Sequence, residues 1–182
     1  MKKQFVFQLT FVLISVIALS QNNTKAKYIT AWGVIGKNIE PRTELMAGKD
    51  IYLQISDERT LTHKNWERIA LEFEKTLAAT YPDANFHLVS ASESANIEQA
   101  KTTVIKVEIP DCQTYLSKGK WFTKTTFDIT LWHGGETDER VFSYDIEKGN
   151  MWGNTTAMII HEKAYKIAMD GLLTYLDEIF SE

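Results

Sequence analysis

The chain has 182 residues with 24 acidic and 20 basic side chains, which give it a formal net charge of −4. A net negative chain without a block of basic residues is a poor partner for nucleic acid or anionic lipid. The sequence holds one cysteine, which excludes an internal disulfide, so stability must come from a packed core.

The first twenty residues have the order of charge and hydropathy that is typical of a secretory signal peptide. Lys2 and Lys3 precede an apolar run from Phe5 to Leu19, and the chain turns polar at Ser20. We expect cleavage after Ser20, which leaves 21–182 as a single domain in the periplasm or outside the cell, without a stable membrane anchor. The alternative is a retained N-terminal anchor, although the run is shorter than the roughly 20 residues that span a bilayer.

The first half of the expected domain combines short strands with one helix. Residues 28–35 and 51–55 have the period of two that predicts strands, and a loop with glycine and proline separates them. Apolar residues then recur every three or four positions from Trp66 to Leu77, which predicts an amphipathic helix that Thr62 caps and Tyr81-Pro82 ends. A short strand follows at 86–89. We expect it to run parallel to 51–55 through a right-handed crossover.

Three further strands and a long helix make up the second half. After a polar stretch with room for one helical turn, strands are predicted at 103–109, 121–132 and 141–146. A connection at 113–120 and a glycine turn at 133–137 would join them as an antiparallel meander. The last helix, from about 155 to 180, has an apolar stripe. It carries Gly171 at its middle, where close contact with the sheet would explain a glycine.

These elements predict an α+β domain with two layers. A mixed, mostly antiparallel sheet forms one layer, and two amphipathic helices cover one of its faces. The predicted order along the chain is β-β-α-β-β-β-β-α, and the other face of the sheet should remain wet.

The sequence contains no motif that predicts catalysis, a metal site or a cofactor. His161-Glu162 begins like the zinc-protease helix motif, but Tyr165 stands where the second histidine ligand would be. We therefore expect His161 to be an exposed histidine on a helix surface. Cys112 follows Asp111, an acid that disfavours a reactive thiolate, so a buried thiol is favoured over a nucleophile or a disulfide between chains.

Two pairs of adjacent carboxylates could in principle perform acid–base chemistry. They are Asp57-Glu58, at the end of a predicted strand, and Asp138-Glu139, after the glycine turn. Neighbouring residues of a strand point in opposite directions, and carboxylates in turns are usually solvated. We therefore expect neither pair to be catalytic.

A set of aromatic and apolar side chains forms the candidate contact surface. Phe122 and Trp132 share the polar-rich face of the longest strand, and we expect Phe142 and Tyr144 of the next strand to join them there. Met151 and Trp152 lie in the loop that follows. Such a cluster can mark a contact with an envelope protein or a glycan. The alternative is that these side chains pack beneath loops or pair across strands.

The order of elements resembles that of small bacterial envelope domains, such as the auxiliary lipoproteins of transport and outer-membrane assembly systems. The matching parts are 51–59 running into the helix around 66–77, then 102–109, 121–133, 141–146 and the last helix. The resemblance implies a binding or scaffolding role and brings no catalytic residues with it. The lipid-carrying cysteine of those proteins is missing, since Cys112 lies far from the apolar run.

The leading hypothesis is therefore an exported, non-enzymatic protein that binds another envelope component through its sheet face or its loops. A second hypothesis is a carrier of a small apolar ligand, with a pocket between sheet and helices lined by Trp66, Phe73 and Phe127. A third is an unrecognised hydrolase, which would need two histidines or carboxylates to converge in one cleft.

Overall fold

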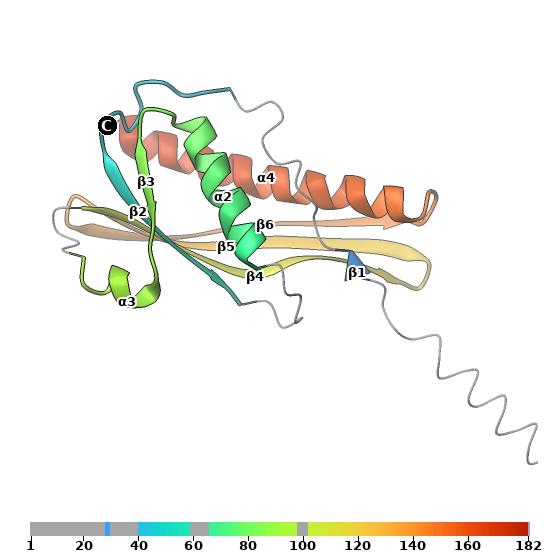
Figure 1. Ribbon diagram of the computed structural model, residues 1–182. Helices are drawn as coiled ribbons and strands as arrows, with labels where there is room; N and C mark the ends of the chain where they lie inside the picture. Colours follow the sequence, from blue (N-terminus) through green and yellow to red (C-terminus); the bar gives the residue numbers. More distant parts are fainter. Residues whose placement is uncertain (1–27, 30–39, 59–65, 98–101, 182) are drawn as a thin grey trace, which may run out of the picture.

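The computed structural model describes residues 28–29, 40–58, 66–97 and 102–181 (Figure 1). The expected signal peptide, the Thr62 cap and the end of the first predicted strand lie outside these ranges. The elements, in chain order, are β1 (Tyr28–Ile29), β2 (Asp50–Asp57), α2 (Trp66–Thr80), β3 (Asn85–Leu88), α3 (Ala91–Ser94), β4 (Thr103–Ser117), β5 (Lys120–His133), β6 (Glu136–Gly149) and α4 (Asn154–Ser181).

The predicted α+β architecture with a mixed sheet is confirmed. The strands are ordered β3-β2-β4-β5-β6, and β1 pairs with β4 off this path. β2 runs parallel to β3 and β4, as the crossover through α2 requires, whereas β4, β5 and β6 form an antiparallel meander. β1 and β2 pair with different stretches of β4, β2 near its start and β1 near its end.

The meander strands are longer than the sequence pattern indicates. β4 continues to Ser117 through the segment expected to be a connection, and a tight turn at Lys118 and Gly119 leads directly into β5. Both turn residues have positive φ, 48° and 73°, as a two-residue hairpin turn of type I′ requires. A register shift between Glu108 and Asp111 hid the continuation, because it interrupts the period of two at Pro110.

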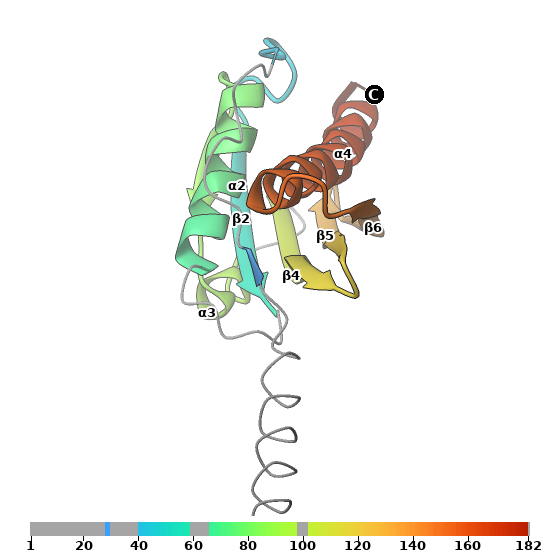
Figure 2. The same cartoon turned by 90° about the vertical axis from the view of Figure 1, so that its right-hand side faces the viewer.

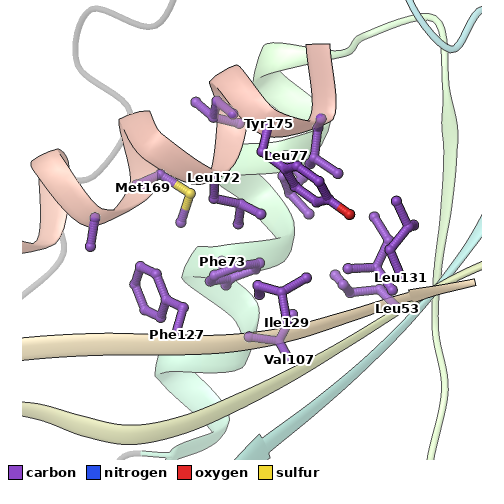
Figure 3. Close-up of a cluster of buried hydrophobic side chains, with 14 of the residues drawn as sticks. Leu53, Phe73, Leu77, Val107, Phe127, Ile129, Leu131, Met169, Leu172 and Tyr175 are labelled. Carbon is purple, nitrogen blue, oxygen red and sulfur yellow. The ribbon is translucent and has the colours of Figure 1, made fainter. Parts of the chain in front are cut away.

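Both long helices pack on the same face of the sheet. Phe127 of β5 makes edge-to-face contacts with Phe73 of α2 and Tyr165 of α4, with ring centroids 5.3 Å apart in each pair. Figure 3 shows how side chains of the core, Phe73 and Phe127 among them, meet between the layers. The buried core includes Ile51, Leu53, Phe73, Leu77, Ile105, Val107, Phe127, Ile129, Leu131 and Leu172.

Gly171 lies where α4 closely approaches the sheet on β6. A Cβ at this position would lie 3.1 Å from the Phe142 ring, closer than most side chains tolerate. This close contact is the reason expected for a glycine inside the helix.

At one end of the molecule, the segment 40–49 is fastened to the ends of both helices. Arg42 donates hydrogen bonds to the Tyr81 hydroxyl and to the Leu173 carbonyl, and it forms an ion pair with Asp177. Met46 from the same segment is buried in the core. We call this end, where residues 40–49 meet the last turns of α2 and α4, the base.

No helix in the described part of the chain is long and apolar enough to cross a membrane.

Candidate functional site

Phe122 and Trp132 lie on the uncovered face of the sheet, as predicted, but neither stands clear of it. Phe122 stacks on Tyr115 of β4 with ring centroids 5.5 Å apart. Trp132 is opposite Val104 in the β4–β5 register. Both side chains are half-buried. They therefore pair across strands, which was the alternative interpretation of the aromatic set.

Phe142 and Tyr144 do not share that face, so this part of the predicted surface is wrong. The two-residue turn at Gly134 and Gly135 pairs Phe142 with Phe127 and Tyr144 with Thr125, and paired residues point to the same side. Phe142 consequently faces α4, where its ring lies 5.8 Å from that of Tyr175.

The polar groups of the uncovered face interact mainly with one another. Lys106 pairs with Glu108, and Lys124 pairs with Asp111. Burial, with Glu108 and Asp111 nearby, raises the pKa of Asp128. α3 lies against the same uncovered face, next to β2, where the Ser94 hydroxyl donates a hydrogen bond to the side chain of Gln54. The uncovered face is thus a polar surface on which Lys106 and Lys124 are each paired with an acid.

Met151 and Trp152 are the most exposed large apolar side chains of the described residues, each 74% accessible. They lie in the loop between β6 and α4, at the end of the molecule opposite the base. Figure 1 shows β1, the β4–β5 turn and the start of α4 together at this end, and Figure 2 turns it toward the viewer. We call it the tip: the turn at 118–119, the loop at 149–153 and the start of α4 to Ile159.

The backbone of the tip is firmly held even though its apolar side chains point outward. The amide of Asn150 donates to the Gly119 carbonyl, and the buried Trp121 donates its ring N–H to the Asn150 side chain at 2.9 Å. The amide of Trp152 donates to the Thr156 hydroxyl. Trp121 forms a small core there with Ala157 and Ile160. The exposure of Trp152 is therefore built into an ordered frame.

Two further apolar residues of the tip were missed by the sequence analysis. Met158 and Ile159, in the first turns of α4, are 47% and 51% exposed. They fall outside the stripe that Ala157, Ile160 and Ala164 present to the sheet. The sequence did contain a sign of this surface. Met158 and Ile159 are apolar residues on the polar side of an amphipathic helix, where packing against the sheet does not account for them.

Three lysines lie at the same end of the sheet as this apolar group. Lys118 and Lys120 come from the β4–β5 turn, and Lys148 from the end of β6. The register pairs Lys148 with Trp121 and Gly149 with Lys120, so Lys120 and Lys148 lie at the same end of the sheet but on opposite faces. Lys120 also forms an ion pair with Glu147.

His161 is buried, which corrects the expectation of an exposed helix-surface histidine. Its Nδ1 is 2.7 Å from the Thr114 hydroxyl, and its Nε2 is 3.9 Å from the Sγ of Cys112. Cys112 is a buried thiol, as expected. Both side chains are covered by α4 and the sheet, so this polar contact belongs to the interior of the fold.

The remaining histidines and carboxylates serve local contacts. His87 pairs with Asp50, and His133 is 2.9 Å from the Thr103 hydroxyl, while burial and the charge of Lys49 lower the pKa of His133. Among the described residues, no group of three or more histidine, cysteine, aspartate or glutamate side chains is arranged to hold a metal ion. His63 lies outside the described residues.

The carboxylate pairs do not form a joint site within the described ranges. Asp138 accepts hydrogen bonds from Tyr175 and Arg140, which lower its pKa against the effect of burial, while Glu139 is exposed. Burial and the bond to Asp138 raise the pKa of Tyr175 to about 12. Glu58 is exposed, and the side chain of Asp57 lies outside the described part of the structure.

The interior position proposed for an apolar ligand is occupied by protein side chains. Phe73 and Phe127 are fully buried and touch each other, with Tyr165 also against Phe127. The side chain of Trp66, the third expected lining residue, lies outside the described part of the structure. The close packing of the two phenylalanines leaves the carrier hypothesis without support.

No family model and no curated protein matches the chain. Solved structures with a similar arrangement include lipoprotein GNA1162 from Neisseria meningitidis, with 14% identity and a TM-score of 0.39 over 66% of this chain and 98% of that one. The PelC dodecamer from Paraburkholderia phytofirmans has 12% identity and a TM-score of 0.39, covering 79% and 96%. The hypothetical protein CT253 from Chlamydia trachomatis has 10% identity and a TM-score of 0.45, covering 74% and 99%.

Proposed function

We propose that this chain is an exported, non-enzymatic protein of the bacterial envelope that binds another envelope component through its tip. The observation that carries the proposal is the group of four exposed apolar side chains, Met151, Trp152, Met158 and Ile159, on an ordered frame. Export rests on the signal-peptide pattern of residues 1–20.

The position of these side chains supports a contact surface. Isolated exposed apolar residues are common, but a group of large ones at one place marks an interaction site more often than a defect of packing. Tryptophan is also among the residues that contribute most to binding when a partner covers them. Trp152 stays exposed, whereas Trp121, Ala157 and Ile160 form the small core of this end.

The chemistry elsewhere in the described residues favours binding over catalysis. Cys112 and His161 are buried between the sheet and α4, and both Lys106 and Lys124 of the uncovered sheet face are held in ion pairs. A hydrolase needs such groups to converge in an accessible cleft.

A binding experiment with isolated envelopes tests the proposal. The processed protein, recovered from the export compartment, is sedimented with envelope membranes that keep their own proteins and glycans. Exchange of Met151 and Trp152 for serine should reduce the bound fraction at least tenfold. The matched control exchanges Leu71 and Leu88, which are 44% and 49% exposed away from the tip, for serine and should bind within twofold of the native protein.

Two outcomes would overturn the proposal. One is equal binding of the tip variant and the native protein. The other is recovery of the native protein in the cytoplasm with residues 1–20 still attached, because this would remove the basis for export.

A further inference from the structure

We propose that the component bound by the tip is an anionic lipid surface, which the protein touches reversibly and without crossing it. This inference rests on the proposed function, because it names the partner of the same site. Three features of the tip support it: the charge around it, the kind of apolar residue exposed there and the direction in which the described chain enters the fold.

The fold creates a basic surface that the linear sequence lacks. Lys118 and Lys120 are separated from Lys148 by most of two strands, yet the β5–β6 register places them around one end of the sheet. Glu147 neutralises part of this charge through its ion pair with Lys120. Lys118, Lys120 and Lys148 thus make this end of the sheet basic, although the chain has a formal net charge of −4.

The exposed residue types fit the boundary between lipid headgroups and acyl chains. Tryptophan is enriched at this boundary because its ring is largely apolar and carries one polar N–H. The flexible side chains of Met151 and Met158 can adapt to a fluid surface. The lysines around them can keep their ammonium groups among the headgroups while their stems lie along apolar neighbours.

A protein partner would be matched less well by the same residues. Lysine is depleted in protein–protein interfaces relative to the rest of the surface, whereas aromatic residues and methionine are enriched. The lysines therefore separate the two alternatives, because each one near an anionic membrane contributes favourably to binding.

The direction of β1 shows from which end the chain enters the described fold. β1 is antiparallel to β4 and pairs Tyr28 with Tyr115 and Ile29 with Thr114, so Tyr28 is the end nearer the β4–β5 turn. The described chain therefore enters β1 from the side of the tip. The C-terminal end of α4 lies at the opposite end (Figure 1). The end at which the described chain enters the fold is thus the end that exposes Met151 and Trp152, which fits a lipid surface on that side.

Vesicles without protein test the inference. The processed protein is sedimented with vesicles of phosphatidylglycerol and, separately, of phosphatidylcholine. We expect at least tenfold tighter binding to phosphatidylglycerol, with a steep loss at high salt because exposed charges are screened. Exchange of Lys118, Lys120 and Lys148 for glutamine should abolish the preference, since each lysine contributes about fivefold. Glu147→Gln removes the acid that is paired with Lys120, so it should tighten binding to phosphatidylglycerol and serves as a control with the opposite effect.

Fluorescence shows whether the tip itself enters the lipid. Vesicles with brominated acyl chains should quench the emission of Trp152, and most of this quenching should disappear in Trp152→Phe. The readout is specific for the tip, so a retained N-terminal segment would not mimic it. Leu71→Ser with Leu88→Ser should leave both binding and quenching unchanged.

The outcomes distinguish this inference from the proposed function. Equal binding to both lipids, no vesicle binding, or quenching that persists in Trp152→Phe would overturn the lipid surface as the partner. If the tip variant still failed to bind whole envelopes in that case, the proposed function would stand and the partner would be a protein or a glycan. Envelope binding that is independent of the tip would overturn both.

Discussion

The base and the tip lie at opposite ends of the same sheet and are built differently. At the base, three parts of the chain converge on a continuous core, and Arg42 joins them through Tyr81, Leu173 and Asp177. At the tip, a small core around Trp121 is enough to hold the backbone, while Met151 and Trp152 remain in water. Apolar surface is buried at one end and displayed at the other.

This difference separates stability from binding. Each buried apolar side chain stabilises the fold in proportion to the area it removes from water, so substitutions near the base should reduce stability. Exposed side chains contribute little to folding, so substitutions at the tip should change binding and leave stability intact. The predictions below test that separation, from the largest expected effect to the smallest.

Leu172→Ala should destabilise the protein by about 3–5 kcal/mol, because it opens a cavity in the fully buried core under α4. Urea denaturation followed by circular dichroism measures the change. Met158→Ala, on the exposed side of the same helix, is the control and should cost under about 0.5 kcal/mol. Similar losses for the two variants would contradict the division between the ends.

Arg42→Ala should cost about 1–2 kcal/mol, since it removes two hydrogen bonds and one ion pair that join residues 40–49 to both helices. Hydrogen exchange should quicken in the last turns of α2 and α4 and remain unchanged in the β4–β5 turn. Faster exchange at the tip would show that the two ends are coupled.

With Tyr175→Phe, the free energy of unfolding should fall less steeply as the pH rises above 10. The pKa of Tyr175 is raised to about 12 in the fold, against about 10 in an unfolded chain. Its contribution is therefore complete below pH 10 and is lost as pH rises toward 12. Thermal unfolding at a series of pH values measures this slope. An unchanged slope would show that Tyr175 does not govern it.

Thr125→Val should stabilise the protein by about 1 kcal/mol. The Thr125 hydroxyl is fully buried and has no hydrogen-bond partner among the described residues, so an apolar group of the same shape removes a desolvation cost. Calorimetry would record a higher melting temperature. A loss of stability would mean that the hydroxyl is satisfied in the folded protein.

Trp152→Ser should change the free energy of unfolding by under about 0.5 kcal/mol, the smallest effect of the series, because the side chain is exposed and the loop is held by its backbone. The same variant is expected to lose binding to envelopes. A large loss of stability would instead make Trp152 part of the small core.

The fold was predictable because its strands and helices have clear periods. Alternation from Trp121 to Leu131 identified the face that the helices cover, and the three-and-four spacing of Phe73 and Leu77 identified the face of α2. The parallel pairing of β2 and β3 followed from the helix between them. Pro110 is the exception, because a bulge resets the period and hides the second half of β4.

The candidate site was harder to predict because it depends on register. Shifting the β5–β6 pairing by one residue moves Phe142 from one face to the other, and the sequence indicated a turn of five residues where the fold uses two. His161 was misplaced although Ala157 and Tyr165, one turn away on either side, are buried. The lysines of the tip come together only through strand pairing, which no linear pattern reveals.

The enclosure of Cys112 has a consequence for the proposed export. A single accessible thiol would cross-link two chains wherever oxidants are present, whereas a sulfur shielded beneath α4 reacts only when that helix lifts from the sheet. The rate at which a thiol reagent modifies Cys112 in the folded protein therefore measures how often α4 separates from the sheet. No introduced cysteine is needed for this measurement.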